Sequence, residues 1–393
     1  MKIALVHDWL TGMRGGEKCL APFCRRFSDA PLYTLLHARG RTAPEIERMQ
    51  ITTSFLQRIP GIERYYRYWL PLMPRAIESF QIDASVDLVL SFSHAVAKSV
   101  RPPPGVPHVC YCFTPMRYAW QLRGDYFGDE PSSSSSARRR AAETPRRVVG
   151  ALRGRVLDGL RRWDRATADR VTHYVAISQT IRRRIADCYG RESTVIYPPV
   201  DTDFYTPGDV PREDFYLMVS ALAPYKKVQV AVEACQRLRR RLVVIGAGPE
   251  VRSLARQARS TTQLMGWRSD EEIRDHLRRC RALLFPGHED FGIVPVEAQA
   301  CGAPVIAYER GGATETVLPA DERRLGTGVF FGRQTPEALC EAMLWFERHE
   351  HQVSARLARR QALKFHPSRY EESLLHYLEQ VAGMRGAPVR RAA

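Results

Sequence analysis

Short apolar runs alternate along the chain with longer segments in which apolar residues recur at helical spacing. Each run is bounded by turn or loop residues, which is typical of buried strands. The runs in the first half of the chain are Lys2–His7, Asp87–Ser91, His108–Cys112, Tyr174–Ile177 and Thr194–Tyr197. Those in the second half are Phe215–Ser220, Arg241–Ile245, Thr262–Met265, Ala282–Phe285, Val305–Ala307 and Gly328–Phe331. Strands that alternate with helices in this way form parallel sheets, so the pattern predicts an α/β protein with doubly wound sheets.

The length of the chain predicts two domains. Its 393 residues exceed what one ordinary hydrophobic core holds. Pro198-Pro199 and Pro207-Gly208 lie between the two groups of strands and flank the expected hinge. We therefore predict domains at 1–200 and 201–365, each with a parallel sheet that binds ligands beyond the carboxyl ends of its strands.

Composition predicts a cytoplasmic protein. The apolar runs fall short of the roughly 18 residues that span a membrane, and the chain enters a strand at once, without the regions of a secretory signal. The nine cysteines are scattered singly apart from Cys110 and Cys112, so they form neither a disulfide framework nor zinc-ligand spacing. They are typical of small core residues in a reducing compartment.

The net charge of +16 has its densest source between Arg138 and Arg165, where ten arginines face three acids. This segment follows the run Ser132–Ser136, which is typical of a flexible surface loop. Apolar residues recur at helical spacing between the arginines. That pattern suits a basic amphipathic helix on an anionic membrane surface and, with equal weight, an ordinary helix with solvated arginines. Nucleic acid ranks well below the membrane as a partner, because no zinc-finger, helix-turn-helix or RNA-binding signature accompanies the charge.

Glu289 and Glu297 carry the most specific chemical signal in the chain. They follow the apolar run Ala282–Phe285 and bracket the loop Phe291–Val294 and Pro295, a residue suited to the first position of a helix. The loop should place free backbone N–H groups at a helix N-terminus, which attracts phosphate. Carboxylates on either side of a diphosphate are placed to accept hydrogen bonds from sugar hydroxyls. The arrangement predicts a nucleotide-sugar site, against the alternative of one plain loop carboxylate and one helix-terminal carboxylate.

Further motifs accompany the two glutamates along nearly the whole chain. They lie at Val6–Glu17, Ser93–Lys98, Thr114–Trp120, Val195–Asp201, Val244–Glu250, Phe291–Val296, Gly302–Ile306 and Gly311–Glu315. With these motifs the chain resembles the retaining glycosyltransferases of family 4, which have the GT-B fold, and within them the bacterial polysaccharide mannosyltransferases that use GDP-mannose. The resemblance implies two doubly wound parallel-sheet domains that face each other across a cleft. It also implies that a C-terminal helix within 366–393 completes the first domain.

The resemblance implies roles for individual residues as well. Glu289, on the transferred sugar, and Lys226, on the leaving diphosphate, are the implied catalytic residues. The implied donor-binding positions are Gly15, Gly16, Lys226, Lys227, Phe291, Gly292, Ile293, Val294 and Glu297, of which Glu297 holds the ribose. The acceptor-side positions are His94, Arg117 and Tyr118. Neither a metal ion nor a cofactor is expected, because Lys226 and loop amides bind the diphosphate.

The expected function is transfer of a sugar, mannose from GDP-mannose, to a lipid-linked or nascent glycan at the inner face of the cell membrane. Two departures from the family pattern matter. Relatives usually carry an arginine where this chain has Ala221 and a histidine where it has Phe113. These departures support a second interpretation, a catalytically weakened homologue that binds a nucleotide-sugar or a partner transferase as an accessory subunit. A nucleotide-sugar epimerase is the third, and the acceptor-side aromatics and the basic helix argue against it.

Overall fold

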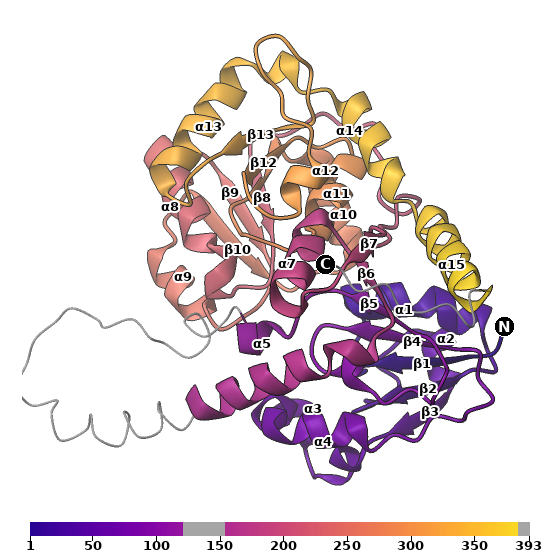
Figure 1. The fold of residues 1–393 in the computed structure, drawn as a ribbon. Helices are drawn as coiled ribbons and strands as arrows, with labels where there is room; N and C mark the ends of the chain where they lie inside the picture. Colours follow the sequence, from indigo (N-terminus) through magenta and orange to yellow (C-terminus); the bar gives the residue numbers. More distant parts are fainter. Residues whose placement is uncertain (121–153, 384–393) are drawn as a thin grey trace, which may run out of the picture. The chain divides into compact units, whose positions relative to one another are not determined.

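The computed structural model describes residues 1–120 and 154–383 (Figure 1). The chain divides into two compact units, Met1–Ile196 with Glu371–Ala393, and Tyr197–Tyr370. We call them the N-terminal unit and the C-terminal unit. Each is built on one parallel sheet with helices packed against it, which confirms the predicted α/β class with two doubly wound sheets.

Seven parallel strands form the sheet of the N-terminal unit, in the order β3-β2-β1-β4-β5-β6-β7. They are β1 Ile3–His7, β2 Pro31–Thr34, β3 Gln50–Thr53, β4 Leu88–Ser93, β5 His108–Cys112, β6 His173–Ala176 and β7 Ser193–Val195. Every residue of β1, β4 and β5 is buried, as expected for central strands that are covered on both faces. β1 pairs with β4 so that His7 lies opposite Phe92, and the carboxyl ends of the two strands therefore lie together.

The apolar pattern did not reveal β2 and β3. β2 has four residues and begins with a proline. β3 lies at the edge of the sheet, and its residues alternate between exposed and half-buried. An edge strand of this kind needs few apolar residues, so its Gln-Ile-Thr-Thr sequence carries no strong signal. The five strands that were predicted for this unit all lie within a few residues of their expected positions.

Helices connect most of these strands and cover the sheet (Figure 1). They are α1 Gly15–Arg26, α2 Pro44–Glu47, α3 Ile62–Tyr65, α4 Met73–Glu78, α5 Arg117–Trp120, α7 Gln179–Tyr189 and α15 Pro367–Gly383, and residues 154–166 are also helical. α15 buries Leu374, Leu378 and Val381, which share one face of the helix. Its Glu371 pairs with Arg25 of α1 at 3.1 Å. The C-terminal helix thus packs on the unit in which the chain begins.

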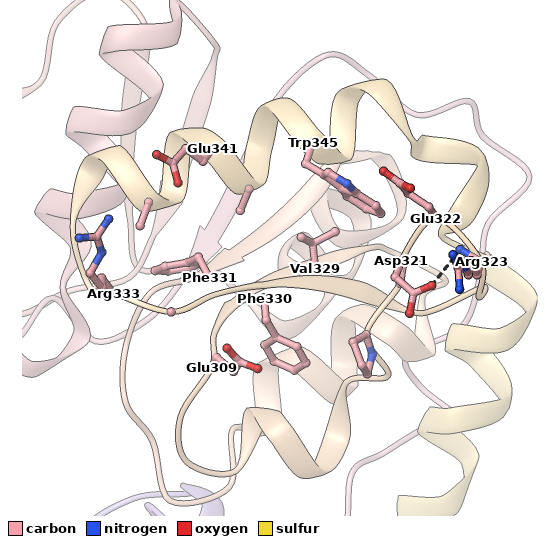
Figure 2. A pocket seen from close by; sticks show the side chains of 15 residues that line it. Glu309, Asp321, Glu322, Arg323, Val329, Phe330, Phe331, Arg333, Glu341 and Trp345 are labelled. Atoms are coloured by element: carbon pink, nitrogen blue, oxygen red, sulfur yellow. Dashed lines mark hydrogen bonds between the residues drawn. The ribbon is translucent and has the colours of Figure 1, made fainter.

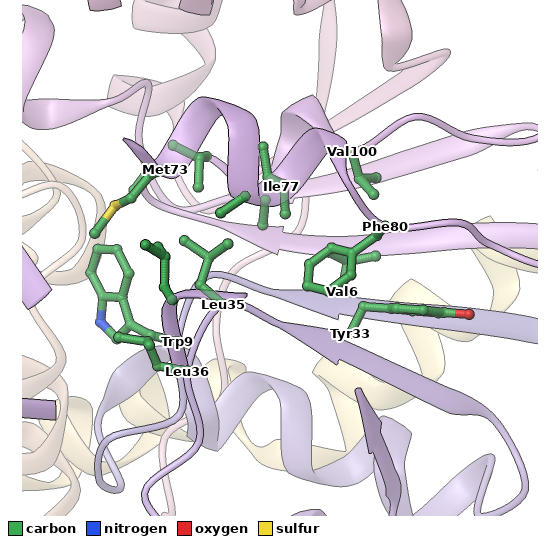
Figure 3. Close-up of a cluster of buried hydrophobic side chains, with 14 of the residues drawn as sticks. Val6, Trp9, Tyr33, Leu35, Leu36, Met73, Ile77, Phe80 and Val100 are labelled. Carbon is green, nitrogen blue, oxygen red and sulfur yellow. The ribbon is translucent and has the colours of Figure 1, made fainter. Parts of the chain in front are cut away.

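A hydrophobic cluster that includes Trp9, Leu36 and Met73 packs against the sheet (Figure 3). Trp9 follows the end of β1 by two residues and is only 5% exposed. Its ring meets that of Tyr66 with the centroids 4.9 Å apart. Aromatic pairs at this separation add about 0.5 to 1.5 kcal/mol to the free energy gained by burial. The cluster therefore holds the backbone in place immediately after β1.

The helical residues 154–166 pack their apolar side on the same cluster. Leu157 and Leu160 are buried in it, and Trp163 packs against it. The indole Nε1 of Trp163 also donates a hydrogen bond to Glu78 of α4 at 2.8 Å. The apolar stripe of this helix is therefore used within the protein, as the interpretation of an ordinary packed helix expects.

The arginines of this helix lie on its other side. Arg155, Arg161, Arg162 and Arg165 are exposed. The predicted serine run, 132–136, and the first part of the predicted basic segment, 138–153, lie outside the described residues. In the described part of the segment, the exposed arginines are what remains available to an anionic surface.

A buried ion pair joins the helical residues 154–166 to the segment that follows β4. Lys98 is 1% exposed and Asp164 is fully buried, and Lys98 Nζ lies 3.1 Å from Asp164 Oδ1. Asp164 Oδ2 accepts hydrogen bonds from Trp120 Nε1 at 2.7 Å and from Tyr189 OH at 2.8 Å. Burying a charge costs several kcal/mol, so it persists only with partners of this kind. The cluster ties four parts of the N-terminal unit together.

Six parallel strands form the sheet of the C-terminal unit, in the order β10-β9-β8-β11-β12-β13. They are β8 Tyr216–Val219, β9 Leu242–Ile245, β10 Thr262–Gly266, β11 Ala282–Phe285, β12 Val305–Tyr308 and β13 Gly328–Phe331. All six coincide with predicted apolar runs. β8, β11 and β12 are neighbours, so the loops that follow them share one edge of the sheet.

The helices of the C-terminal unit are α8 Val228–Leu238, α9 Val251–Gln257, α10 Asp270–Arg279, α11 Ile293–Ala300, α12 Ala313–Thr316, α13 Pro336–Arg348 and α14 Ala355–Ala362. Three of them, α10, α13 and α14, begin after a residue whose side chain caps the helix. Ser269 and Glu272 form a reciprocal capping box at the start of α10. Thr335 caps α13, whose first residue is Pro336. Local sequence therefore sets the starts of the capped helices.

The cysteines are core residues, as predicted. All nine are unpaired, and all but Cys340, which is half-buried, are buried. Burial raises the pKa of the Cys24 and Cys280 thiols to about 12, because the thiolate would lose its hydration. The reducing compartment inferred from their spacing stays a prediction.

Lys98→Met should destabilise the N-terminal unit by about 3 kcal/mol, because it leaves the buried Asp164 carboxylate without its cation. Thermal unfolding would show this as a midpoint several degrees below that of the wild type. Arg101→Met is the matched control: Arg101 pairs with Glu78 but is 60% exposed, and its loss should shift the midpoint little. Equal midpoints for Lys98→Met and the wild type would contradict a stabilising role for the pair.

Candidate active site

Lys226 and Glu289 meet at the carboxyl edge of the C-terminal sheet. β8 and β11 are paired neighbours; Lys226 ends a short 3-10 helix that follows β8, and Glu289 lies in the loop that follows β11. Lys226 Nζ lies 2.5 Å from Glu289 Oε1, and the two side chains are 14% and 21% exposed. The two residues predicted to be catalytic thus form a partly exposed ion pair in which each charge balances the other.

Gly311 and Gly312 let a second loop, the one after β12, approach the backbone of Glu289. Gly312 N donates a hydrogen bond to Glu289 O at 2.9 Å. A Cβ at Gly311 would lie 2.2 Å from Glu289 O, and a Cβ at Gly312 would lie 2.2 Å from Phe291 Cα. Gly311 also has a φ of 75°, which glycine adopts without strain. The glycine motif therefore fixes the loop that carries Glu289.

The loop Phe291–Val294 leads into α11, which begins at Ile293 after Gly292 in a left-handed conformation, φ 86°. Pro295 is therefore the third residue of the helix, and the prediction that it would be the first was wrong. Proline still fits there, because the N–H groups of the first four helical residues have no intrahelical acceptor and proline, which lacks an N–H, loses no hydrogen bond. The N–H groups of Ile293 and Val294, in the same first turn, lack intrahelical acceptors for the same reason.

Glu297 differs from Glu289 in its surroundings. It lies in the second turn of α11 and is only 7% exposed. Burial first, and then the negative charge of Glu297, raises the pKa of the Tyr205 hydroxyl. Phe291, which was also predicted to bind the donor, has a buried side chain. It can therefore offer a ligand mainly its backbone.

Lys227 and Ala221 lie on either side of the short turn that follows β8. Lys227 has a φ of 55° and precedes the first residue of α8. A left-handed conformation is uncommon for lysine and marks a position that its surroundings hold in place. Ala221 is exposed, so the described fold leaves room there for a longer side chain such as arginine.

In the N-terminal unit, Gly15 and Gly16 are the first two residues of α1. A Cβ at Gly16 would lie 3.2 Å from His7 Nε2 and 3.5 Å from the Phe113 ring, so glycine lets the helix start approach both side chains. His7 is fully buried, and its Nε2 has no hydrogen-bond partner among the described residues. Buried polar atoms without partners are rare in native proteins, so a water molecule, an ion or a ligand is the expected partner of this nitrogen.

Asp8 organises the loop that follows β4. Its Oδ2 accepts hydrogen bonds from His94 N at 2.6 Å and Ala95 N at 3.0 Å, and its Oδ1 accepts from Val96 N and Ala97 N at 2.7 Å each. The His94 imidazole Nδ1 lies 3.0 Å from Oδ2. Burial alone would raise the pKa of Asp8, but the charge and hydrogen bonds of His94 outweigh it and hold the pKa at about 2.

Asp8 and His7 are site residues that the sequence reasoning missed. The available signal was slight: two polar residues that follow an apolar strand at once, in the motif Val6–Glu17. Their importance depends on partners far along the chain, since Asp8 and His94 are 86 positions apart.

The structure places the three acceptor-side candidates at two neighbouring strand ends. His94 follows β4 and is joined to Asp8, whereas Arg117 is the first residue of α5, a few residues beyond β5. Tyr118 lies in the same short helix, and its side chain is outside the described part of the structure. Contact of these residues with an acceptor stays a prediction.

A cavity of about 860 Å³ lies elsewhere, beside β13 and α13 (Figure 2). Phe330, Trp345, Glu309 and Glu341 are among the residues that line it, and none of the predicted site residues does. β13 is the edge strand of its sheet. Doubly wound sheets bind ligands beyond the carboxyl ends of their strands, so we place the candidate active site at the strand ends and not in this cavity.

Two family matches together cover most of the chain. Residues 13–204 match the family described as Glycosyltransferase Family 4, and residues 203–364 match the family described as Glycosyl transferases group 1. The chain belongs to the glycosyltransferases of family 4. The family predicted from the motifs is therefore confirmed.

Relatives of this family 4 glycosyltransferase include mannosyltransferases. It is 29% identical to the O-antigen chain mannosyltransferase C of Escherichia coli over 191 residues. This match covers 44% of this chain and 49% of that protein. It is also 31% identical to the GDP-mannose-dependent alpha-(1-6)-phosphatidylinositol monomannoside mannosyltransferase of Mycolicibacterium smegmatis over 186 residues. This match covers 36% of this chain and 45% of that protein. The chain thus spans about half the length of the curated relatives it matches.

Solved structures share the fold over nearly the whole glycosyltransferase chain. Sucrose-phosphate synthase from Thermosynechococcus elongatus matches with a TM-score of 0.69 at 14% identity and covers 98% of this chain and 100% of that one. Anabaena Alr3699/HepE in complex with UDP matches with a TM-score of 0.68 at 17% identity and covers 97% and 100%. These likenesses concern the fold, and they confirm the predicted GT-B architecture.

Asp8→Asn should destabilise the protein in a pH-dependent way. The pKa of Asp8 is about 2 in the fold against an ordinary 3.8, so the ionised carboxylate stabilises the fold above about pH 4. That contribution, about 2 kcal/mol, is lost as the pH falls through the folded pKa. Urea unfolding should therefore show a deficit in the free energy of unfolding at about pH 7 that shrinks toward pH 3.

Asp29→Asn serves as the control for this prediction, because Asp29 is exposed and should contribute little. A deficit for Asp8→Asn that has the same size at both pH values would contradict the role assigned to the charge of Asp8.

Proposed function

We propose that this glycosyltransferase family member is a retaining transferase that moves mannose from GDP-mannose to a lipid-linked or nascent polysaccharide. The observation that carries the proposal is the Lys226–Glu289 ion pair, whose glutamate lies in the loop that continues into the N-terminus of α11. A lysine near open helix N–H groups suits a diphosphate, and a carboxylate suits the hydroxyls of the attached sugar. The choice of mannose is supported by the names of the mannosyltransferase relatives, one of which is GDP-mannose-dependent.

In this proposal the bound donor separates the ion pair and gives each of its two side chains a new partner. The diphosphate takes Lys226 as its counter-charge, while Glu289 accepts a hydrogen bond from a hydroxyl of the transferred mannose. Glu297 accepts hydrogen bonds from the ribose hydroxyls. Because the pair is already partly buried, its charges and their orientation are largely in place before the donor binds.

Transfer breaks the bond between the anomeric carbon and the diphosphate oxygen, and the electron pair leaves on the diphosphate. Negative charge therefore grows on the leaving oxygen, and a fixed cation with helix N–H groups stabilises it more in the transition state than in the bound donor. In the retaining course that we propose, the acceptor hydroxyl bonds to the same face of the sugar and its proton passes to the leaving diphosphate. We assign no protein nucleophile. We also propose that Lys226 and Lys227 bind the diphosphate without a metal ion, and that the amides of Gly15 and Gly16 offer a phosphate contact.

An accessory protein that binds a nucleotide-sugar without transferring it is the second candidate. It rests on Ala221, where relatives usually carry an arginine, and on Phe113, where they usually carry a histidine. Incubation with GDP-mannose and a membrane extract separates the two functions. Release of GDP with labelled glycan indicates the transferase, and donor binding without GDP release indicates the accessory protein.

We further propose that the protein attaches peripherally to the inner face of the cell membrane. No helix within residues 1–120 and 154–383 is long and apolar enough to cross a bilayer. The apolar side of residues 154–166 is taken up by the hydrophobic core, so attachment through this helix would be electrostatic and would use its exposed arginines. The preceding basic residues 138–153 extend the same charge along the sequence.

Glu297→Gln should weaken binding of both GDP-mannose and GDP, because a charged acceptor for two ribose hydroxyls becomes a neutral one, and a loss of about tenfold in affinity is expected. Glu289→Ala should lower kcat more than it lowers GDP affinity, because its proposed partner is on the transferred sugar. Calorimetry and a GDP-release assay measure the two effects. Glu341→Gln, at an exposed glutamate of the same unit, should change neither. Wild-type GDP affinity in Glu297→Gln would remove the ribose assignment.

Replacing Arg155, Arg162 and Arg165 by Gln should weaken sedimentation with anionic lipid vesicles. Each basic residue near such a surface contributes about 1 kcal/mol, so three should lower binding roughly a hundredfold, and wild-type binding should fall as salt rises. The control replaces three exposed arginines of the C-terminal unit, Arg252, Arg256 and Arg259. Equal losses in both triple variants would show that only net charge matters, and an absence of wild-type binding would remove the membrane proposal.

A further inference from the structure

The edge strand β13 has backbone groups that its own sheet does not use. Glu309 N, just beyond the end of β12, donates a hydrogen bond to Phe331 O at 3.0 Å, so Phe331 directs its backbone toward β12. The backbone groups of successive strand residues point to opposite sides. Those of Gly328 and Phe330 therefore point away from β12, toward the edge of the sheet.

A short segment, Leu318–Ala320, covers only the first part of this edge. It runs parallel to β13, and its last residue donates its N–H to Gly328 O at 2.9 Å. Asp321 and Arg324 then exchange two backbone hydrogen bonds, of 3.1 and 3.3 Å, so the chain turns back there. Among the described residues, none offers the N–H or C=O of Phe330 a hydrogen bond on this side. The backbone of β13 is thus paired at Gly328 and open at Phe330.

The cavity of about 860 Å³ lies at this open part of the strand (Figure 2). Phe330 lines it from β13, and α13 forms a wall with Ala338, Ala342 and Trp345. The small side chains of the two alanines leave room between the helix and the strand. An open sheet edge beside such a hollow suits an extended peptide, which adds a strand through main-chain hydrogen bonds and places alternate side chains in the hollow.

The charge of the cavity is opposite to that of the whole chain. Four acidic residues and two arginines are among those that line it: Glu309, Asp321, Glu322, Glu341, Arg323 and Arg333. Glu309, Glu322 and Glu341 are exposed, and none of them forms an ion pair with a described residue. The whole chain has a net charge of +16. A basic peptide is therefore attracted to this cavity, while the net charge of the chain repels it elsewhere.

The same charge argues against a second copy of this chain as the partner. Pairing of two β13 edges would bring the carboxylates of both copies together, and like charges on adjacent strands are destabilising. Acidic side chains along an edge strand oppose pairing of this kind. The edge is thus open to a basic strand and closed to a copy of itself.

We propose that the open part of β13 binds an extended, basic segment of a partner protein as an added strand. The backbone of that segment pairs with Phe330, in line with Leu318–Ala320. Its arginine or lysine side chains reach the carboxylates of Glu309, Glu322 and Glu341. None of the residues to which we assign donor binding lines the cavity, so the proposal does not rest on the proposed function.

A synthetic probe tests the part played by charge. The probe is a fluorescent nonapeptide of alternating arginine and valine, whose binding is followed by fluorescence anisotropy at low salt. Replacing Glu309, Glu322 and Glu341 by Gln should lower its affinity about tenfold, and salt should weaken wild-type binding. The control replaces three exposed acids of the same unit by their amides, at Asp209, Glu233 and Glu271. Equal losses in both triple variants would overturn the cavity as the binding site.

Phe330→Pro tests the main-chain hydrogen bonds. Proline removes the Phe330 N–H, which the sheet does not use, so the thermal midpoint should change little. Phe330→Ala is the matched control for the lost ring. We expect the probe to bind Phe330→Pro about fivefold more weakly than Phe330→Ala, the effect of one lost hydrogen bond. Equal affinity for the two variants would overturn the added strand.

Hydrogen exchange of the wild-type protein tests the same contact without a substitution. The probe should slow exchange of the Phe330 amide. A fully N-methylated probe, which keeps the charge but has no N–H donors, should bind more weakly. Failure of the unmodified probe to bind at low salt would overturn the proposal, and so would binding that leaves exchange at Phe330 unchanged. Exchange at Phe330 that slows with protein concentration in the absence of the probe would identify a second copy as the partner and overturn our choice.

Discussion

Parallel strand pairing is the constraint on which the rest of the structure depends, because it brings residues that follow different strands to one edge of a sheet. In the C-terminal unit, β8 and β11 are neighbours, so Lys226 and Glu289 meet although they are far apart in sequence. In the N-terminal unit the same rule acts on β1, β4 and β5. Asp8, His94 and Phe113 follow these three strands and lie together. Each sheet thus assembles its own half of the proposed chemistry from neighbouring strand ends.

Much of the fold could be predicted from the sequence because parallel strands that are buried on both faces are continuous apolar runs. The buried strands β8, β9, β11 and β12 of the C-terminal sheet are visible in this way, whereas β10, also predicted, is an edge strand whose residues are not fully buried. The limits of the pattern are equally physical. β3 is a polar edge strand, and its sequence resembles that of a loop. Pro295 suits any of the first positions of a helix, so its presence locates the start of α11 only to within a turn.

The site in the N-terminal unit could be predicted only in part. Glycines at the start of α1 are a local signal, and they were recognised. The role of Asp8 is not local, because its carboxylate accepts hydrogen bonds from a loop 86 positions away. These bonds form only because β4, the strand before that loop, pairs with β1. The contacts of His7 with Trp9 and of His94 with Asp8 and Phe113 are tertiary as well. The resemblance could therefore name His94 as a site residue, but it could not supply the partners of its side chain.

The burial of the cysteines has a practical consequence. The thiolate is the form of cysteine that reacts with thiol reagents. Burial raises the pKa of the Cys280 and Cys301 thiols to about 12, so little thiolate forms near neutral pH. Burial also shields the sulfur atoms from the reagent. A cysteine placed at an exposed position would react much faster than the native ones. Fluorescent or spin labels could thus be attached to each unit after replacement of the half-buried Cys340 alone, and the distance between the units could be followed in solution as nucleotide-sugars are added.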